Sequence, residues 1–150
     1  MSLKIGDKAP SFDSINQNGD KISLSDFIGR KVILYFYPRD NTPGCTAQAC
    51  NLRDNFELLK DDGFTILGVS SDSVKSHEKF VIKYDLPFDL IADEDKSIHK
   101  KYGTWIEKKM YGKSYMCTAR WTFIIDENGI ITEIIEKVKT KEHTEQIISE

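Results

Sequence analysis

The 150-residue sequence lacks the cysteine and histidine patterns of metal sites and of dithiol redox motifs. Its three cysteines are Cys45, Cys50 and Cys117, and four residues separate the first two, so neither a C-x-x-C motif nor a zinc knuckle is present. The three histidines stand far apart without ligand spacing. An odd number of cysteines also argues against a structural disulfide framework. We therefore expect no metal and no cofactor.

The sequence also lacks an excess of positive charge, a long apolar run and a secretory signal. A net charge of −3 argues against non-specific nucleic-acid binding, which depends on basic patches. The longest apolar runs are too short to span a bilayer. The first ten residues, MSLKIGDKAP, contain no apolar signal-peptide core. We expect a cytoplasmic protein that binds neither nucleic acid nor membranes.

What the sequence does contain is a buried strand that runs directly into a helix carrying a cysteine. Residues 32–37 are an unbroken apolar run rich in β-branched and aromatic side chains, which is typical of a strand buried on both faces. Pro38 ends this strand, because proline cannot donate to a sheet ladder. Pro43 suits the first turn of a helix. The apolar stripe of that helix consists of Cys45, Ala49, Leu52, Phe56 and Leu59.

Cys45 is therefore predicted at a helix N-terminus, where unpaired N–H groups and the helix dipole stabilise anions such as a thiolate. The dipole usually supplies about 0.3–1 kcal/mol. Lowering a cysteine pKa from about 8.5 to about 6 takes roughly 3.4 kcal/mol of preferential thiolate stabilisation. A cationic partner must therefore come from elsewhere in the chain.

The remaining pattern predicts a single domain, residues 1–150, with strands and helices in alternation. We expect a hairpin around Asn18-Gly19, a helix stop at residues 61–63, and an exposed ribbon or loop at 105–118. The other expected elements are strands at 12–15, 21–24, 64–70, 121–125 and 130–138, and a short strand or extended segment at 86–92. We also expect a short turn at 25–27 capped by Ser25, and helices at 73–84, 97–102 and in the last ten residues. This order describes an α/β thioredoxin-like fold with a central mixed sheet flanked by helices and an N-terminal hairpin. Ligands of such sheets bind beyond the carboxyl ends of the strands, where Cys45 lies.

Several segments resemble the peroxiredoxin family, and the resemblance covers nearly the full chain. FYPRDNTPGC matches the Pro-x-x-x-Thr-x-x-Cys motif of that family, with Pro38, Thr42 and Cys45 in register. GDKAPSF, SLSDFIGRKVILYFYP and RWTFIIDENG are similar as well. Arg120 matches the active-site arginine of the family. The second cysteine in CTAQACNLRD resembles the bacterioferritin-comigratory (Q-type) group of atypical two-cysteine enzymes.

The resemblance implies a role for each matched residue. Cys45 would attack a peroxide as the thiolate and become a sulfenic acid. Arg120 would stabilise the thiolate and hold a peroxide oxygen. The Thr42 hydroxyl would donate to the thiolate or peroxide and accept from the substrate, and Pro38 would shape the pocket. The backbone N–H groups of Gly44 and Cys45 would bind the attacked peroxide.

The resemblance also implies the rest of the catalytic cycle. Cys50 would form an intramolecular disulfide with Cys45, and thioredoxin or a similar dithiol would reduce it. The substrates would be hydrogen peroxide and organic hydroperoxides, and the enzyme would be a monomer. In a regular helix the Cα atoms of Cys45 and Cys50 lie roughly 8–9 Å apart. A disulfide needs about 4.4–6.8 Å, so the start of the helix would have to unwind.

Two other functions stay open from the residues alone. A thiol–disulfide oxidoreductase shares the fold, although that chemistry favours C-x-x-C. A copper-binding or electron-transfer module needs a histidine or methionine near the cysteine, and the stretch around Cys45 has neither. Cys117 and Trp121 depart from the usual residues of the family beside Arg120, and we expect Cys117 to be a free thiol without a catalytic role.

Overall fold

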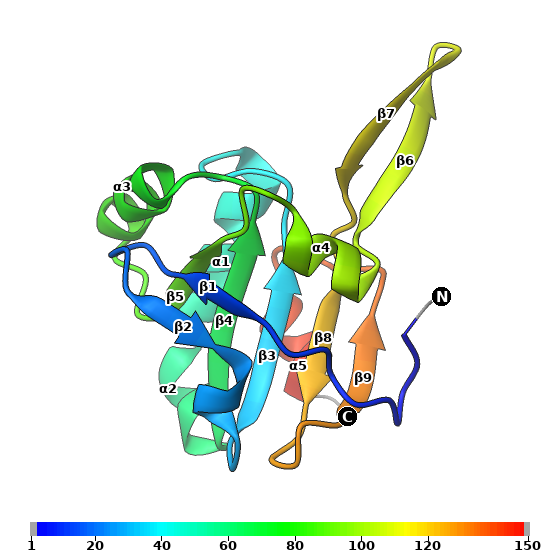
Figure 1. Cartoon of the computed structure of the whole chain (residues 1–150). Helices are drawn as coiled ribbons and strands as arrows, with labels where there is room; N and C mark the ends of the chain where they lie inside the picture. The colour runs from blue at the N-terminus through cyan, green and yellow to red at the C-terminus, as the bar shows by residue number, and fades with distance from the viewer. Residues whose placement is uncertain (1–2, 149–150) are drawn as a thin grey trace.

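The central strand β3 (Lys31–Phe36) organises the structure, a computed structural model that describes residues 3–148 (Figure 1). This strand is parallel to β4 (Phe64–Ser70) and antiparallel to β8 (Thr122–Ile125). Strands β5 (Asp89–Ala92) and β9 (Ile131–Ile135) complete a mixed sheet of order β5-β4-β3-β8-β9. The sheet is the central mixed sheet that the sequence predicts.

Helices and smaller elements cover both faces of this sheet. One face carries α1 (Pro43–Asp54), α2 (Phe56–Asp61), α3 (Val74–Tyr84) and α5 (His143–Ile148). The other carries β1 (Asp13–Ile15), β2 (Lys21–Ser23), the 3-10 helix η1 (Leu24–Phe27) and α4 (Ser97–Tyr102). A separate ribbon, β6 (Trp105–Met110) and β7 (Lys113–Thr118), projects beyond the sheet (Figure 1).

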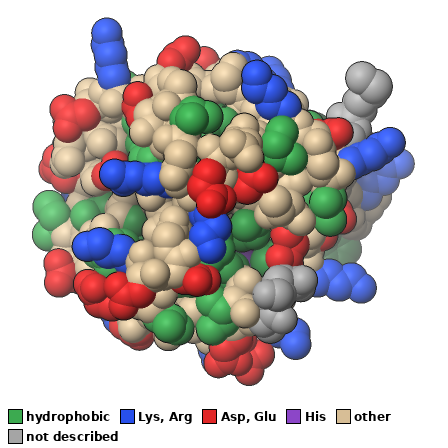
Figure 2. All heavy atoms as spheres, turned by 90° about the horizontal axis from the view of Figure 1, so that it is seen from below, with side chains coloured by type: hydrophobic (Ala, Val, Ile, Leu, Met, Phe, Trp, Pro, Cys, Tyr) green, Lys and Arg blue, Asp and Glu red, His purple; other side chains and the backbone are tan. Residues whose placement is uncertain are grey.

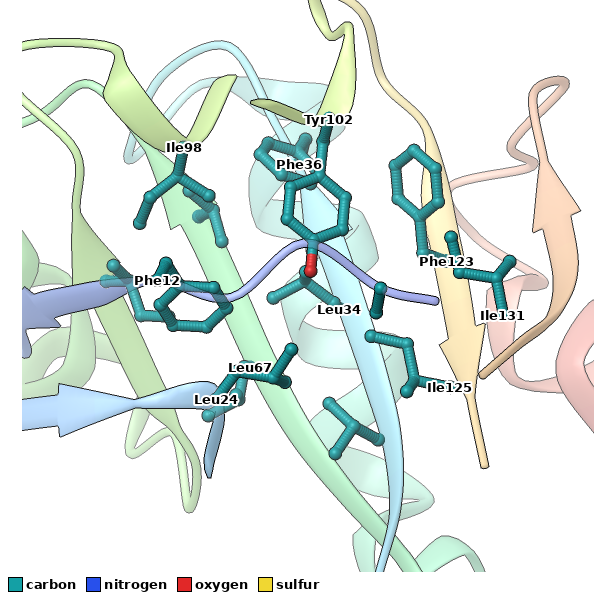
Figure 3. Close-up of a cluster of buried hydrophobic side chains, with 14 of the residues drawn as sticks. Phe12, Leu24, Leu34, Phe36, Leu67, Ile98, Tyr102, Phe123, Ile125 and Ile131 are labelled. Atoms are coloured by element: carbon teal, nitrogen blue, oxygen red, sulfur yellow. The ribbon is translucent and has the colours of Figure 1, made fainter. Parts of the chain in front are cut away.

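Strand β3 divides its side chains between two cores. Leu34 and Phe36 lie in the core beneath the N-terminal hairpin and α4, which Figure 3 shows. Ile33 and Tyr35 lie in the core beneath α1, α2 and α3, together with Cys45. All four of these β3 side chains are buried, because both faces of the strand are covered. This double burial explains why the strand is continuously apolar rather than alternating.

The N-terminal hairpin forms as predicted, but the turn after it starts earlier than expected. Strands β1 and β2 pair antiparallel around Asn18-Gly19. The 3-10 turn begins after Ser23, not Ser25, so the prediction of a Ser25 cap is wrong. The Ser23 backbone N–H donates to the carboxylate of Asp26 at 3.0 Å, which stabilises the earlier start.

The helix that carries Cys45 is interrupted at Asn55, whereas its apolar stripe predicts a continuous helix. Asn55 has φ −109° and ψ 16°, and its side-chain Nδ2 donates to the carbonyl oxygen of Asn51 at 2.8 Å. The backbone N–H of Asn55 also donates to this oxygen, at 3.2 Å, so the side chain shares the acceptor of the regular helical bond at the break. The stripe nevertheless stays in phase across the break, because Leu52 and Leu59 are both fully buried.

The segment at 105–118 forms a ribbon, which is one of the two alternatives predicted for it. Its strands pair along their whole length and are joined at Tyr111 and Gly112, whose φ angles are 53° and 76°. Elsewhere β8 starts one residue later than predicted and β9 ends at Ile135 instead of residue 138. The final helix is present, and residues 149–150 of that prediction lie outside the described residues.

The surface carries charges of both signs. Figure 2 shows the end of the molecule opposite the ribbon, where Lys, Arg, Asp and Glu side chains are scattered among apolar ones. No large basic patch is visible on that face. Within residues 3–148, none of the helices combines the length and apolar character required to cross a membrane.

The structure predicts stability effects of very different size for two adjacent leucines in α2. Leu59 is 0% exposed and Leu58 is 51% exposed. We expect Leu59→Ala to lower the free energy of unfolding by about 2–5 kcal/mol, because it leaves a cavity beneath the sheet. Leu58→Ala is the matched control and should change it by less than about 0.5 kcal/mol. Urea unfolding of the reduced proteins measures both, and equal losses would contradict the register of α2.

Candidate active site

The site begins where β3 ends and the chain turns into α1. Pro38 follows the strand and is exposed at the rim of the site. Asn41 adopts a left-handed conformation with φ 60°, and Thr42 is the N-cap of α1 with φ −93° and ψ 157°. Pro43 occupies the first turn, where its missing N–H costs no hydrogen bond. Cys45 therefore lies in the first turn of α1, as predicted, and is 1% exposed.

The cationic partner of Cys45 is Arg120. Its Nη2 donates to the Cys45 Sγ at 3.3 Å, and its Nη1 donates to Oε1 of Gln48 at 3.0 Å. Arg120 stands just before β8, which is antiparallel to β3, so it reaches the carboxyl end of β3. Gln48 thus binds Nη1 of the guanidinium, while Nη2 points toward the Cys45 sulfur.

Gly44 makes room for this contact. A Cβ atom at Gly44 would lie 3.3 Å from Nη2 of Arg120, tighter than an ordinary contact. A side chain at this position would require Arg120 to shift by a few tenths of an ångström, so the glycine favours the close approach. Its φ angle is not in the left-handed region. The substrate-binding role of its backbone stays a prediction.

Thr42 is placed differently from the prediction in one respect. Its hydroxyl donates to the carbonyl oxygen of Arg39 at 2.9 Å, rather than to Cys45. The hydroxyl oxygen keeps its acceptor capacity, and Thr42 remains next to the start of α1. In this state the hydroxyl shapes the loop, and its predicted role toward the substrate stays a prediction.

The structure separates the three thiols. Cys45 and Cys50 lie in the same helix, and Cys50 is partly buried. Cys117 lies on β7 of the ribbon, opposite Ile106 on β6. All three are free thiols. The structure therefore brings Cys45, Gly44 and Arg120 together, with Cys50 further along α1.

Two buried polar groups that sequence reasoning missed accompany Cys45. Among the described residues, only the Tyr35 hydroxyl and the Gln48 Nε2 are buried side-chain groups without a hydrogen-bond partner. Burial raises the pKa of Tyr35 well above its ordinary value, and the nearby charge of Cys45 adds to this, so the phenol stays neutral. The helical spacing of Gln48, three residues after Cys45, was the available signal for its place.

His143 of α5 is a second neutral group near the site. Burial lowers the pKa of His143, and the charge of Arg120 lowers it further, while a hydrogen bond to Gln146 opposes the shift. Its Nδ1 lies 2.9 Å from Oε1 of Gln146 and its Nε2 lies 2.8 Å from Oγ1 of Thr122. Arg120 is therefore the cation that faces Cys45.

Possible metal ligands gather at one place among residues 3–148, formed by Asp40, Asp72 and His77. Their polar atoms are already engaged within the protein. The Nδ1 of His77 lies 2.7 Å from Oδ2 of Asp40, and its Nε2 lies 3.0 Å from the carbonyl oxygen of Ile91. Oδ2 of Asp72 accepts from the backbone N–H of Asp40. These bonds account for the cluster without an ion.

Comparison with known proteins identifies the family. The profile of the AhpC/TSA family matches residues 5–134. This chain is a peroxiredoxin of that family. Peroxiredoxin Bcp of Escherichia coli K12 is 42% identical over 147 residues, covering 98% of this chain and 94% of the relative. The peroxiredoxin is thus of the Bcp/PrxQ type, as its sequence predicts.

Solved structures agree with this assignment. A cysteine-to-serine mutant of Xylella fastidiosa PrxQ is similar with a TM-score of 0.92 and 31% identity, covering 99% of this chain and 95% of that one. The Xanthomonas campestris bacterioferritin comigratory protein is similar with a TM-score of 0.88 and 32% identity, covering 92% and 88%. The thioredoxin-like fold and the prediction of a peroxidase are thereby confirmed.

The geometry of this peroxiredoxin predicts the effect of removing the cation. We expect Arg120→Ala to slow the reaction of Cys45 with peroxide by roughly 10²-fold, because it removes the donor that faces the sulfur and the developing charge. Stopped-flow kinetics measures this rate. Arg30→Ala, which removes an exposed arginine before β3, is the control and should leave the rate unchanged. An unchanged peroxide rate in Arg120→Ala would show that the contact has no catalytic role.

Proposed function

We propose that the chain, as a single domain over residues 1–150, reduces hydrogen peroxide and organic hydroperoxides with Cys45 as the nucleophile. The contact of 3.3 Å between Arg120 and the Cys45 Sγ is the observation that carries this proposal. The similar bacterioferritin comigratory protein of Xanthomonas campestris has alkyl peroxide reduction activity. The same class of substrate suits a small site at a helix N-terminus that stabilises anions.

The first chemical step is a displacement at oxygen. The Cys45 thiolate attacks one peroxide oxygen, the O–O bond breaks, and the sulfur becomes a sulfenic acid. The leaving oxygen takes up a proton and departs as water or an alcohol. Arg120 and the N–H groups at the start of α1 stabilise the negative charge that moves to the leaving oxygen. Pro38 and Thr42 shape the loop that borders this reaction.

The second step forms a disulfide. The Cys50 thiol attacks the Cys45 sulfenic acid, a sulfur–sulfur bond forms, and water leaves. Both cysteines belong to α1, and five positions along a helix rise about 7.5 Å and turn about 140°. The helix must therefore open before the bond can form. The part of α1 ahead of Leu52 buries Cys45, Gln48 and Ala49, and no large apolar side chain anchors it.

Thioredoxin or a similar dithiol then reduces the disulfide and returns both thiols. We propose that the enzyme works as a monomer in the cytoplasm and needs no metal or cofactor. A thiol–disulfide oxidoreductase is the alternative, but the Cys45–Cys50 spacing in α1 requires a rearrangement that C-x-x-C avoids. Peroxide consumption with a thioredoxin system, compared with insulin reduction and copper titration, separates these functions.

Serine substitutions test the division of labour among the thiols. We expect Cys45→Ser to abolish peroxide turnover, because the other thiols have no contact with Arg120 in the closed site. Cys50→Ser should keep the first oxidation, slow recycling by thioredoxin, and promote sulfinic acid at Cys45. Cys117→Ser serves as the control, with nearly unchanged turnover. Mass spectrometry after one equivalent of peroxide identifies the oxidised cysteine, and turnover by Cys45→Ser would contradict the proposal.

The proposed disulfide predicts a local change in α1. In the reduced protein α1 begins at Pro43, and we expect oxidation to convert the stretch through Cys50 into a loop. Amide hydrogen exchange should become faster at residues 46–52, and α2 should stay protected because Leu59 is buried. The α3 helix provides an internal reference. Equal protection of 46–52 in a verified Cys45–Cys50 disulfide would rule out this opening.

A further inference from the structure

A buried aspartate lies inside the loop between β3 and Cys45. Asp40 is 7% exposed, and its carboxylate accepts hydrogen bonds from two hydroxyl groups. The Tyr37 hydroxyl donates to Oδ1 at 2.6 Å, and the Ser76 hydroxyl donates to Oδ2 at 2.8 Å. The backbone N–H of Asp40 donates to Oδ2 of Asp72 at 2.7 Å. Both the side chain and the backbone of this loop residue are therefore tied to their surroundings.

A further contact joins Asp40 to His77 in α3. The His77 Nδ1 lies 2.7 Å from the Asp40 Oδ2, and the two side chains are 0% and 3% exposed. The Nε2 of the same ring lies 3.0 Å from the carbonyl oxygen of Ile91 in β5. Both ring nitrogens of His77 are therefore engaged, one by the loop and one by the sheet.

Both ends of helix α3 form hydrogen bonds with the loop between β3 and α1. Ser76 and His77, in the first turn of α3, bind Asp40. At the other end, Tyr84 donates its hydroxyl to Oδ1 of Asn41 at 3.0 Å. Because Asn41 leads directly into the Thr42 N-cap, these contacts determine where α1 begins.

We propose that Asp40 and His77 are positioning residues for peroxide reduction. The pair fastens the loop to α3, so that the first turn of α1 presents Cys45 to Arg120. This inference rests on the proposed role of Cys45, and neither residue contacts the sulfur. A displacement of about 1 Å at a reacting group can cost roughly 10²-fold in rate. Attack on peroxide needs that alignment, whereas alkylation of a thiol by a small neutral reagent needs only a thiolate and access.

The test compares these two reactions in Asp40→Asn. We expect oxidation of Cys45 by peroxide to slow by roughly 10–100-fold, and alkylation by iodoacetamide to change by less than about threefold. Leu58→Ala is the control, because Leu58 is 51% exposed on α2, outside the loop, and its removal should alter neither rate. Circular dichroism at the assay temperature establishes that each variant is folded.

Ser76→Ala extends the test to a milder change. It removes one donor to Asp40 and leaves the pair with His77 intact, so we expect a loss of roughly threefold to tenfold in the peroxide reaction only. The proposal is overturned if folded Asp40→Asn keeps its peroxide rate, if both reactions slow equally, or, where Asp40→Asn does not fold, if Ser76→Ala reacts as wild type. Failure of the wild-type protein to oxidise at Cys45 would instead overturn the proposed function.

Discussion

The contact of the Arg120 guanidinium with the Cys45 sulfur, made across the backbone of Gly44, is the interaction on which the site depends. A helix N-terminus alone stabilises an anion by about 0.3–1 kcal/mol, too little to keep a thiolate charged at neutral pH. The antiparallel pairing of β3 and β8 brings a cation from a segment 75 residues away to this helix. The topology of the sheet therefore determines which cation lies beside the thiol. Gln48 orients the guanidinium, because it binds Nη1 and leaves Nη2 to face the Cys45 sulfur.

Much of this arrangement could be predicted from the sequence. The apolar run before Pro38, the proline at the start of the helix and the position of Cys45 each follow from local rules of strand and helix formation. The need for a cation follows from two free energies, because a helix N-terminus supplies less than the stabilisation that the thiolate requires. Its identity, Arg120, came from resemblance to a family, since no periodicity links a residue before β8 to the start of α1. The N-terminal hairpin followed from a turn dipeptide, Asn18-Gly19.

The features that could not be predicted depend on tertiary contacts or on competition between local bonds. At the break in the helix the Asn55 side chain binds the Asn51 carbonyl oxygen, a contact that a hydrophobic stripe does not reveal. Asp40 and His77 are 37 residues apart and look like an ordinary loop aspartate and an isolated histidine. The hydroxyl of Thr42 donates to the carbonyl oxygen of Arg39 in the same loop. In each case a polar group is hydrogen-bonded to a partner that the folded structure brings near, and no sequence pattern reveals that partner.

The unpaired hydroxyl of Tyr35 and the unpaired Nε2 of Gln48 have an energetic consequence for the closed site. A buried donor without a partner costs about 1–3 kcal/mol relative to one that water can reach. Among the described residues, both such donors flank the reactive cysteine, and the rest of the core carries none. Opening α1 would let solvent satisfy them, which offsets part of the cost of breaking helical bonds. The fold is thus locally frustrated at the segment that the proposed disulfide requires to move.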